Sequence, residues 1–411
     1  MKLAIDRDRL LADLTALGKI GRGSDGGISR RALSAEDAEA RRYVAGRMRE
    51  AGLEVRHDEV GNLRGTRAGR RLDAPVVMTG SHLDTVPSGG PLDGPLGVVG
   101  AVAAIESLNR AEVDTEQAIE VVVFVGEEGS RFPRGTIGSA AISGHVAVDA
   151  ILALTDPDGV RYGHALASYG DLGPAIPARA WPGQIAAYVE LHVEQGAVLE
   201  GAGVPIGVVT AIAGLVQHRI IFHGDANHAG ATPMALRKDA LLVAAEWALA
   251  VERTARELGG GAVATVGKLE VSPGGKNIIP GRVEAIVDLR APDRELLDAL
   301  DTRICALPDA IARARGVTVE TARLQRVEPG PMAERPMRAV EEAARACELS
   351  SQRMVSGAIH DALHLAEICP ATMIFVPSIG GKSHCPNEDT APAELENGCR
   401  VLAHTLAILA G

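Results

Sequence analysis

Three short apolar runs constrain the fold of this chain more than any other feature of its sequence. They read APVVMTG (74–80), IEVVVFVG (119–126) and ATMIFVPS (371–378), without the polar alternation of a strand that has one face in water. Strands that are apolar on both faces must be covered on both, as in a parallel sheet between two layers of helices. A helical pattern at 96–109 separates the first two runs. We therefore predict an α/β fold with a mostly parallel sheet.

Two further helices carry signals that mark their first residues. The pattern from Ser34 onwards predicts a helix with Ser34 as its N-cap, Asp37 at its third position and Gly52 as its stop. Farther along, the segment TPMALRKDALLVAAEWALAVERTAREL predicts a longer helix with Thr232 as its cap and Pro233 at its first position. We expect both helices to begin at these side-chain caps.

A second structural unit is predicted inside the chain. Strand patterns lie at 217–224, 262–271, 281–290 and 317–327, and helical patterns lie at 232–258 and 293–315. Their order, β-α-β-β-α-β, is typical of a ferredoxin-like domain. The chain then returns to a helical pattern at 337–350 and to the last apolar run. We predict one catalytic domain, residues 1–212 and 329–411, interrupted by an α+β ferredoxin-like domain at residues 213–328.

Composition narrows the class of protein. With 411 residues, 46% of them hydrophobic and 23% charged, the chain is long enough and mixed enough for two globular cores. A net charge of -11 and an aromatic content of 2% disfavour nucleic-acid binding, which needs clustered cations and aromatic stacking platforms. No apolar run approaches the roughly 20 residues of a membrane span, and no signal-peptide pattern opens the chain. Five cysteines without a C-x-x-C pair favour a reducing compartment, so we expect a cytoplasmic protein without membrane partners.

Residues of the kind that bind metals follow the first apolar run. The loop SHLDTVPSGGPLDG holds His82, Asp84 and Asp93, at a strand end where α/β proteins usually bind their ligands. Asp84 is placed to hold the second imidazole nitrogen of His82 behind a metal, and Asp93 to be a ligand from the loop. A turn rich in Gly, Pro and Asp would account for Asp93 alone, but not for the His-x-Asp pair.

Acids and histidines also follow the other apolar strands. Glu127 and Glu128 come after the second run, His384 after the third, and His192 lies near the end of a further strand pattern, AAYVELHVE. Adjacent carboxylates point in different directions, so one can bind metal while the other moves a proton. Each residue alone has a plainer explanation, namely a solvated acidic turn or a buried structural histidine. Together they predict one metal site at the strand ends.

The number of candidate ligands indicates more than one ion. His82, Asp93, Glu128, His192 and His384 are five donors, whereas a single tetrahedral zinc takes four. Two ions that share a bridging carboxylate would use all five and leave positions for water. A crowded single site remains the alternative on this count.

Seven ordered segments resemble the hydantoinase/carbamoylase family of dinuclear metal amidohydrolases. This family includes N-carbamoyl-L-amino acid hydrolases, β-ureidopropionases and allantoate amidohydrolases. The segments are GSHLDTV…GGPLDGPLGV, FVGEEGSRF, ELHVEQG, ANHAGATPMALRKDA, NIIPGRVEAIVDLR, SGAIHDA and VPSIGGKSH, and they span nearly the whole chain. The resemblance implies a zinc-exopeptidase-like catalytic domain, whose inserted domain serves as a lid and as the interface of a homodimer.

The resemblance also implies a role for each matching residue. Asp93 would bridge two divalent ions, zinc first and manganese, cobalt or nickel as alternatives. The other implied roles are His82 and His192 on one ion, Glu128 and His384 on the other, Glu127 as general base, His228 as the oxyanion donor, Arg290 and Asn277 on the substrate carboxylate, and Gln195 and Gln217 as further substrate contacts. By their residue types alone, Arg290 could equally pair with Asp288, and His228 could be only a loop contact.

Two positions depart from the family pattern. Ile359 stands where the family usually has glycine, and Lys382 stands where it usually has an apolar residue. His360 and Asp361, in the same motif as Ile359, are expected to support the ligands or to pack behind them. Lys382 lies next to a proposed ligand, so it could change the charge at the substrate pocket. These departures put the identity of the substrate in more doubt than the metal site.

The activity implied by the resemblance is hydrolysis of the carbamoyl C–N bond of an N-carbamoyl-L-amino acid or a related small ureido acid. Allantoate amidohydrolase and β-ureidopropionase are the near alternatives. A dipeptidase or N-acyl amino acid deacylase on the same scaffold is more distant, because such relatives usually have aspartate where His192 stands. An alternative from another class is a metal-free binding protein that kept the fold, which would hold no stoichiometric metal.

Overall fold

The structure, a computed structural model, describes residues 3–169 and 175–411. Its internal contacts divide the chain into two units. The first unit consists of Met1–Thr210, Met332–Met354 and His360–Gly411, and the second of Ala211–Pro331 and Val355–Ile359. Residues 211–212, 329–331 and Val355–Ile359 group with the second unit, whereas the sequence predicts them in the catalytic domain.

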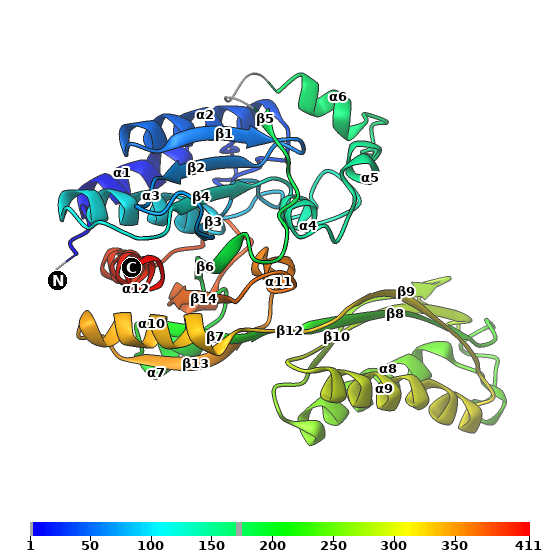
Figure 1. The fold of residues 1–411 in the computed structure, drawn as a ribbon. Helices are drawn as coiled ribbons and strands as arrows, with labels where there is room; N and C mark the ends of the chain where they lie inside the picture. The colour runs from blue at the N-terminus through cyan, green and yellow to red at the C-terminus, as the bar shows by residue number, and fades with distance from the viewer. Residues whose placement is uncertain (1–2, 170–174) are drawn as a thin grey trace. The chain divides into compact units, whose positions relative to one another are not determined.

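Four parallel strands form the centre of the sheet in the first unit (Figure 1). They are β3 (Val76–His82), β4 (Ile119–Phe124), β6 (Ile185–Val193) and β14 (Ala371–Val376), in the order β14-β6-β3-β4. Every residue of β4 and of β14 is buried, so both faces of these strands are covered, as their apolar sequences require. The mixed α/β fold with a mostly parallel centre is therefore confirmed.

The remaining strands of this sheet flank the parallel centre. Strands β2 and β1 continue it in antiparallel fashion beyond β4, and β7 pairs antiparallel with β14. These and the short additional strands are β1 (Glu54–Asp58), β2 (Leu63–Arg67), β5 (Ala175–Ile176), β7 (Ile206–Ile212), β12 (Gly330–Pro331) and β13 (Ser351–Ser356).

Helices cover the parallel strands. Helix α3 packs on β3, β4 and β6, while α10 and α12 pack on β6 and β14; α11 contacts α4 as well as the sheet. The helices of the first unit are α1 (Arg7–Leu17), α2 (Ala35–Glu50), α3 (Pro95–Arg110), α4 (Ile137–Ser143), α5 (Val148–Leu152), α6 (Tyr162–Ala167), α7 (Val198–Ala202), α10 (Glu334–Ala346), α11 (Ala362–Leu365), α12 (Pro392–Ala410) and the 3-10 turn η2 (Ile379–Gly381).

In the first unit, the ends of α2 agree with the prediction from local sequence, whereas those of α10 do not. Ser34 caps α2 as predicted, because its hydroxyl accepts the backbone N–H of Asp37, and Gly52 follows the end of the helix with a φ of 80°. Helix α10 differs from the predicted range of 337–350. It starts at Glu334 and ends at Ala346, and the residues after it form β13, a strand that the sequence analysis did not predict.

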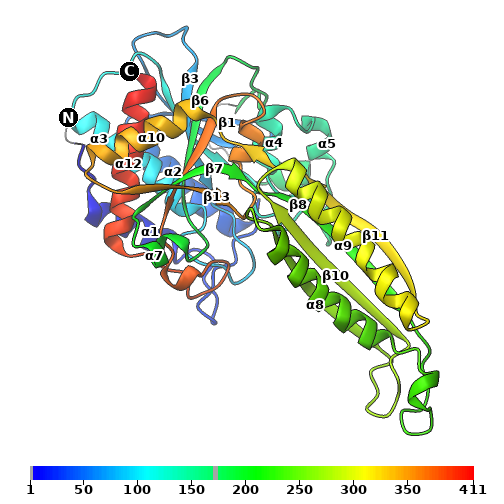
Figure 2. The same ribbon diagram turned by 90° about the horizontal axis from the view of Figure 1, so that it is seen from below.

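The second unit contains an antiparallel sheet with two helices on one face (Figure 2). Its order along the chain is β-α-β-β-α-β, and the strands lie in the order β11-β8-β10-β9. The elements are β8 (Gly214–His223), η1 (Met234–Leu236), α8 (Ala240–Leu258), β9 (Val263–Ser272), β10 (Arg282–Ala291), α9 (Arg294–Ala314) and β11 (Thr318–Val327). Trp247 of α8 packs on Phe222 of β8 in the core between helices and sheet.

The predicted start of the long helix in this unit is wrong. Helix α8 is capped by Asp239, whose carboxylate accepts the N–H groups of Leu241 and Leu242. Pro233 has a ψ of 147°, which is not helical, and only the short turn η1 lies between it and Asp239. Both Thr232 and Asp239 are residue types that cap helices, and in the folded chain the later one takes the role.

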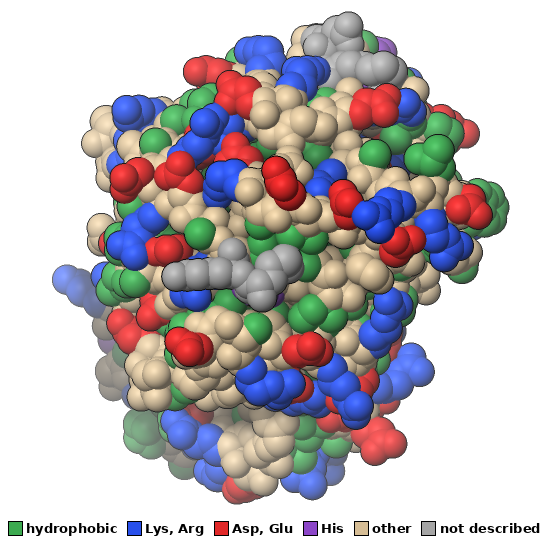
Figure 3. Space-filling model, turned by 60° about the vertical axis from the view of Figure 1, so that its left-hand side comes forward, with side chains coloured by type: hydrophobic (Ala, Val, Ile, Leu, Met, Phe, Trp, Pro, Cys, Tyr) green, Lys and Arg blue, Asp and Glu red, His purple; other side chains and the backbone are tan. Residues whose placement is uncertain are grey.

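Charges of both signs are mixed on the surface shown in Figure 3, where neither sign dominates. Among the residues that the structure describes, no helix combines the length and the apolar composition needed to cross a membrane. The cysteines at positions 305, 347, 369, 385 and 399 are all free thiols.

Candidate metal centre

The four parallel strands deliver the predicted ligands to one edge of the sheet. His82 is the last residue of β3, and His192 lies next to the end of β6. Glu127 and Glu128 follow β4, and His384 follows β14 and the turn η2. Because the strands are parallel, their carboxyl ends meet at the same edge, which is where such sheets usually bind ligands.

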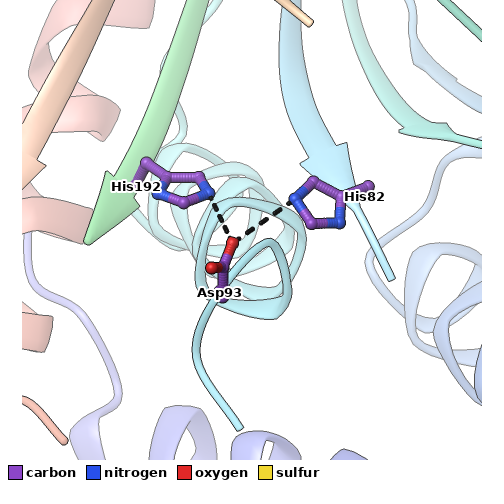
Figure 4. A group of neighbouring side chains, drawn as sticks. All are labelled: His82, Asp93 and His192. Atoms are coloured by element: carbon purple, nitrogen blue, oxygen red, sulfur yellow. Dashed lines mark ion pairs between the residues drawn. The ribbon is translucent and has the colours of Figure 1, made fainter. Parts of the chain in front are cut away.

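Asp93, just before α3, lies at the middle of this group (Figure 4). Its Oδ1 atom is 3.2 Å from Nε2 of His192 and 3.6 Å from Nε2 of His82. Its Oδ2 atom is 3.1 Å from Nε2 of His384, which in turn lies 3.7 Å from a carboxylate oxygen of Glu128. The two oxygens of one carboxylate therefore face two different sets of donors, as a bridging ligand requires.

His82 and His192, which are both buried, each direct Nε2 toward Asp93. Nδ1 of His82 contacts the backbone carbonyl of Asp84 at 2.9 Å, and Nδ1 of His192 contacts the carbonyl of Val193 at 2.9 Å. A carbonyl oxygen can only accept a hydrogen bond, so each neutral ring carries its hydrogen on Nδ1 and has a lone pair on Nε2. Nε2 of His192 is buried and makes no hydrogen bond to any described residue.

These residues fit divalent ions. Neutral imidazole nitrogens and carboxylate oxygens are the donors that zinc and similar ions take, and an orphaned lone pair beside a carboxylate is costly without a cation. His82, Asp93 and His192 are buried, and their donor atoms lie within 4.8 Å of one another. The donor atoms of His82 and the half-buried Glu127 and Glu128 also lie within 4.8 Å of one another. Divalent metal is therefore the ligand class that the arrangement supports.

Charge in the group is balanced between the carboxylates and the rings. Burial lowers the pKa of His82, but the nearby carboxylates, Glu127 foremost, outweigh it and raise that pKa well above its ordinary value. Contact with Asp93 raises the pKa of His384 to about 9. Although burial opposes it, the histidines hold the pKa of Asp93 well below its ordinary value. The site thus stabilises positive charge among its donors, which is also what it must do for a metal ion.

Glu127 sits beside these donors with a carboxyl group that retains its proton easily. Its Oε2 atom lies 3.8 Å from Nε2 of His82. Burial is the largest cause that raises the pKa of Glu127 well above its ordinary value, and the neighbouring Glu128 adds to it. The pKa of Glu128 is itself raised to about 7, mainly by burial. A carboxyl group with a raised pKa is suited to proton transfer near neutral pH.

Asp84 acts through other atoms than predicted. Nδ1 of His82 lies 2.9 Å from the backbone carbonyl of Asp84 but 4.0 Å from its carboxylate, so the carbonyl is the hydrogen-bond partner. The carboxylate instead accepts three backbone N–H groups, from Gly126 and Glu127 on Oδ1 and from Glu128 on Oδ2, at 3.1 to 3.2 Å. Asp84 therefore fixes the turn that carries the two glutamates, and its predicted carboxylate contact with His82 is wrong.

Sequence reasoning missed Glu388, which supports the central carboxylate. Oε1 of Glu388 accepts the N–H groups of Leu92 and Asp93 at 2.7 and 2.9 Å. Its Oε2 accepts the hydroxyl of Ser383 at 2.6 Å, and that hydroxyl also lies 2.8 Å from Oδ2 of Asp93. Glu388 follows His384 closely in the sequence, but a single acidic residue in a polar loop gave no sign of this contact.

Gly94 leaves the room that the His82 ring occupies. Its φ is 84°, and a Cβ atom added there would lie 2.5 to 2.7 Å from three atoms of that ring. Only glycine combines this backbone conformation with so close an approach. The dipeptide Asp93–Gly94 thus sets the position of one ligand and makes space for another.

Gln195 lies in the metal centre itself. Its side-chain amide donates to Oδ2 of Asp93 at 2.7 Å, and its Oε1 atom has no hydrogen-bond partner among the described residues. The backbone of Gln195 and that of His384 are left-handed, with φ of 60° and 55°. Such values are uncommon for residues other than glycine, and they cluster at functional sites.

His360 and Asp361 lie behind the donors. The ring of His360 packs on the ring of His192, with 4.6 Å between their centroids. Asp361 accepts the hydroxyl of Ser139 from α4, and both His360 and Asp361 are buried. This packing is the supporting position that the sequence analysis expected for them.

Two of the predicted substrate residues meet in the second unit. The segments of His228 and Asn277 pair through a bridge between His228 and Ile278, and the carbonyl of Asn277 accepts the N–H of Ala229 at 2.9 Å. Nδ1 of His228 accepts the backbone N–H groups of Gly230 and Ala231 at 3.0 and 3.1 Å. The proton of the neutral ring is therefore on Nε2, which is free to donate.

Arg290 and Gln217 are joined through Asp288. Nε and Nη2 of Arg290 donate to the two oxygens of Asp288 at 2.9 and 3.3 Å, so the ion pair considered in the sequence analysis is present. The amide of Gln217 donates to the same carboxylate at 2.9 Å. Nη1 of Arg290 also donates to the carbonyl of Gly357 at 2.7 Å.

The two departures from the family pattern lie in different units. Lys382 is exposed at the end of the turn η2, two residues before His384 in the sequence. Ile359 is half-buried and belongs to the second unit. The Lys382 ammonium makes no hydrogen bond or ion pair with any residue that the structure describes.

The chain is similar to known proteins over nearly its whole length. The model of peptidase family M20/M25/M40 matches residues 78–408. The N-carbamoyl-L-amino acid amidohydrolase of Geobacillus stearothermophilus is 44% identical over 407 residues, which cover 99% of each chain. The allantoate amidohydrolase of Bacillus subtilis (strain 168) is 37% identical over 394 residues, which cover 96% of this chain and 95% of that protein.

A solved structure is similar over almost the whole chain. It is that of an amidase of the hydantoinase/carbamoylase family from Burkholderia multivorans, with a TM-score of 0.96 and 38% sequence identity. The match covers 99% of this chain and 98% of that chain. The similarity therefore includes both units and every proposed ligand's segment.

Proposed function

This chain belongs to peptidase family M20/M25/M40, and from that premise we propose that it hydrolyses the carbamoyl C–N bond of N-carbamoyl-L-amino acids. It is a hydrolase of the amidohydrolase type, like the relatives that it resembles over its full length. The observation that carries the proposal is that His192 and Gln195 contact the two oxygens of Asp93. The products would be the amino acid, ammonia and carbon dioxide.

The proposal assigns two divalent ions to the metal centre. His82 and His192 would hold one ion, Glu128 and His384 the other, and Asp93 both; zinc is the ion that we propose first, with manganese, cobalt or nickel as alternatives. When bound, such ions polarise a substrate carbonyl and lower the pKa of water. The support is the orphaned Nε2 atom of His192 and the division of the Asp93 oxygens between the two groups of donors.

Glu127 is the proposed general base. Its Oε2 atom would accept a proton from the attacking water and return it to the leaving nitrogen. The raised pKa of its buried carboxyl supports this cycle, because a group that binds a proton readily can take it up and then release it to an amine. Asp84 would keep Glu127 in position by holding the backbone N–H groups of its turn.

Residues of the second unit are proposed to act on the substrate. In this proposal the unit is a ferredoxin-like lid, His228 donates its Nε2–H to the oxyanion, and Arg290 with Asn277 binds the substrate carboxylate. A guanidinium has five N–H donors, and three of those of Arg290 are already engaged, so two remain for a ligand. Gln217 and Gln195 would make further polar contacts.

We also propose a cytoplasmic homodimer that associates through the second unit, without nucleic-acid or membrane partners. All five cysteines have free thiols, which supports the proposal that the protein lies in a reducing compartment. The second unit also exposes several large apolar side chains, the residue type that an interface buries. They include Leu242, Leu249, Val263, Leu269 and Leu324.

The proposal is tested with purified full-length protein that has been stripped of metal and reloaded with Zn²⁺, Mn²⁺ or Co²⁺. We expect ammonia release from N-carbamoyl-L-amino acids only after reloading. Replacement Glu127→Gln should lower kcat by about 10²–10⁴-fold, the usual loss for a general base. The exposed Glu116→Gln is the matched control and should keep full activity. Full activity in stripped protein or in Glu127→Gln would contradict the proposal.

A substrate panel separates the alternatives. Allantoate is the second candidate substrate, favoured by the similarity to the allantoate amidohydrolase of Bacillus subtilis. N-carbamoyl-β-alanine tests the ureidopropionase alternative, and release of amino acid from N-acetyl substrates tests the deacylase alternative. The highest kcat/KM in the panel identifies the substrate class.

A further inference from the structure

A second group of metal-binding side chains lies in the first unit and shares no residue with the group around Asp93. His145 follows α4, His364 lies in α11, and Glu367 comes just after α11. Nδ1 of His145 lies 3.1 Å from the carboxylate of Glu367, and Nδ1 of His364 lies 3.2 Å from it. The two imidazole rings lie side by side, with 4.5 Å between their centroids. Donor atoms of all three residues fall within 4.8 Å of one another.

The group has the donors and the access that a metal ion needs. Two imidazoles and one carboxylate form a set that binds zinc in proteins, with a fourth position for water. The side chains of His145 and Glu367 are 44% and 42% exposed, so an ion can enter from solvent. His364 is only 8% exposed and is therefore held in place.

A further contact orients the buried ring. Nε2 of His364 lies 3.1 Å from the hydroxyl of Thr136, which leaves Nδ1 to face Glu367. Metal-binding histidines in general have their second nitrogen held by a hydrogen-bond partner in this way. The backbone N–H of Thr136 donates to the carbonyl of Glu127 at 2.8 Å, so the group is joined to the turn that carries the proposed base.

We propose that His145, His364 and Glu367 form an accessory site for a divalent transition-metal ion of the zinc type. The ion would link the end of α4 to α11, two segments that are far apart in the sequence. Because Thr136 joins His364 to the Glu127 turn, an ion at this site would also restrain that turn. The proposed site does not require that the chain hydrolyse carbamoyl substrates.

Affinity at the accessory site is expected to be lower than at the metal centre. Only one carboxylate contributes charge, and the positive charge of Arg134 acts on that carboxylate. Two of the three donors are also partly open to water, which screens their attraction for an ion. A mild chelator should therefore remove this ion first.

The test counts zinc in the full-length protein. Metal-free protein is dialysed to equilibrium against Zn²⁺, and bound zinc per chain is measured by mass spectrometry. The wild type should bind one equivalent more than His145→Ala and one more than Glu367→Gln. The control His164→Ala removes an exposed histidine of α6 outside the group and should keep the wild-type count. Both group variants alter exposed side chains, so they should fold.

The outcome does not depend on the other centre. If the centre around Asp93 binds two ions, the counts should be three and two; if it binds none, they should be one and zero. Co²⁺ provides a second readout, because visible absorption from the extra ion should be present in the wild type and in His164→Ala but absent from His145→Ala. Equal zinc counts in wild type, His145→Ala and Glu367→Gln would overturn the proposal and leave a metal-free hydrogen-bond network.

Discussion

Oε1 of Glu388 accepts the backbone N–H of Asp93 at 2.9 Å, across a separation of 295 residues. The same carboxylate holds Ser383, whose hydroxyl contacts the Asp93 carboxylate. Glu388 thus fixes both the main chain and the side chain of Asp93, the proposed bridging ligand. Supporting residues of this kind usually matter to a metal site almost as much as the ligands do.

Replacement Glu388→Ala should weaken metal binding and activity by about 10–100-fold, the usual loss when a partner behind a ligand is removed. Glu388→Gln should lose much less, because its amide oxygen can still accept the N–H groups of Leu92 and Asp93. Metal affinity is measured by competition with a chelator of known affinity. Equal affinities in Glu388→Ala and the wild type would remove the positioning role from Glu388.

Asp84 should affect kcat more than KM. Asp84→Ala leaves the N–H groups of Gly126, Glu127 and Glu128 without their acceptor, so the proposed base loses its position. Asp84→Asn keeps an oxygen for the first two and should retain more of the turnover rate. Steady-state kinetics on the best substrate measure both constants. A loss confined to KM would mean that Asp84 acts on substrate binding instead.

Gly94→Ala should release metal without unfolding the protein. The added methyl group would overlap the ring of His82, and the backbone strain at positive φ costs about 1 kcal/mol. Gly159→Ala is the matched control, since Gly159 has a φ of 81° and open space around the added atom. Thermal unfolding should show similar shifts for both variants, while only Gly94→Ala loses bound metal. Retention of both ions in Gly94→Ala would contradict the steric argument.

His192→Ala should bind one metal ion fewer at the Asp93 centre. The buried Nε2 atom of His192 faces Asp93 and has no hydrogen-bond partner among the described residues, so its loss removes a proposed ligand atom, and the ring gives up only the contact of Nδ1 with the adjacent Val193 carbonyl. The exposed His164→Ala in α6 is the control and should keep the wild-type count. Metal analysis of purified proteins tests the difference. An unchanged metal count in His192→Ala would remove His192 from the proposed ligands.

Asp58 should make the protein less stable as the pH rises from about 4 to about 6. Burial raises the pKa of Asp58 to about 6, despite hydrogen bonds from Val60 and Asn62 that oppose the shift. A carboxyl whose pKa is higher in the folded state contributes stability below its unfolded value, near 3.9, and loses it as the pH passes the folded value. The contribution amounts to about 3 kcal/mol at most.

The difference in unfolding free energy between wild type and Asp58→Asn isolates this effect. Urea unfolding at several pH values from 4 to 7 should show the wild type losing stability relative to the variant across that interval. Other titrating groups are common to both proteins and cancel in the difference. A difference that stays constant with pH would show that Asp58 titrates normally.

The strands and most ligands could be predicted because they depend on local sequence. The apolar runs require burial on both faces, and parallel strands place their carboxyl ends at one edge of the sheet. The polar segments that hold His82 and Glu128 mark where two of these strands end. The long helix of the second unit shows the limit of such reasoning. Thr232 and Asp239 are both good caps, and local propensity could not choose between them because the choice depends on packing along the sheet.

The sequence by itself determined which residues could bind metal and the kind of sheet that would bring them together. Only the tertiary structure decided that the Asp84 carboxylate holds the turn of Glu127 and Glu128, that Glu388 supports Asp93, and that His145 meets Glu367. Each of these contacts joins specific atoms of segments that must first fold and pack. Periodicity and residue type carry information about burial and local conformation, whereas the direction of a hydrogen bond depends on where distant segments finally lie.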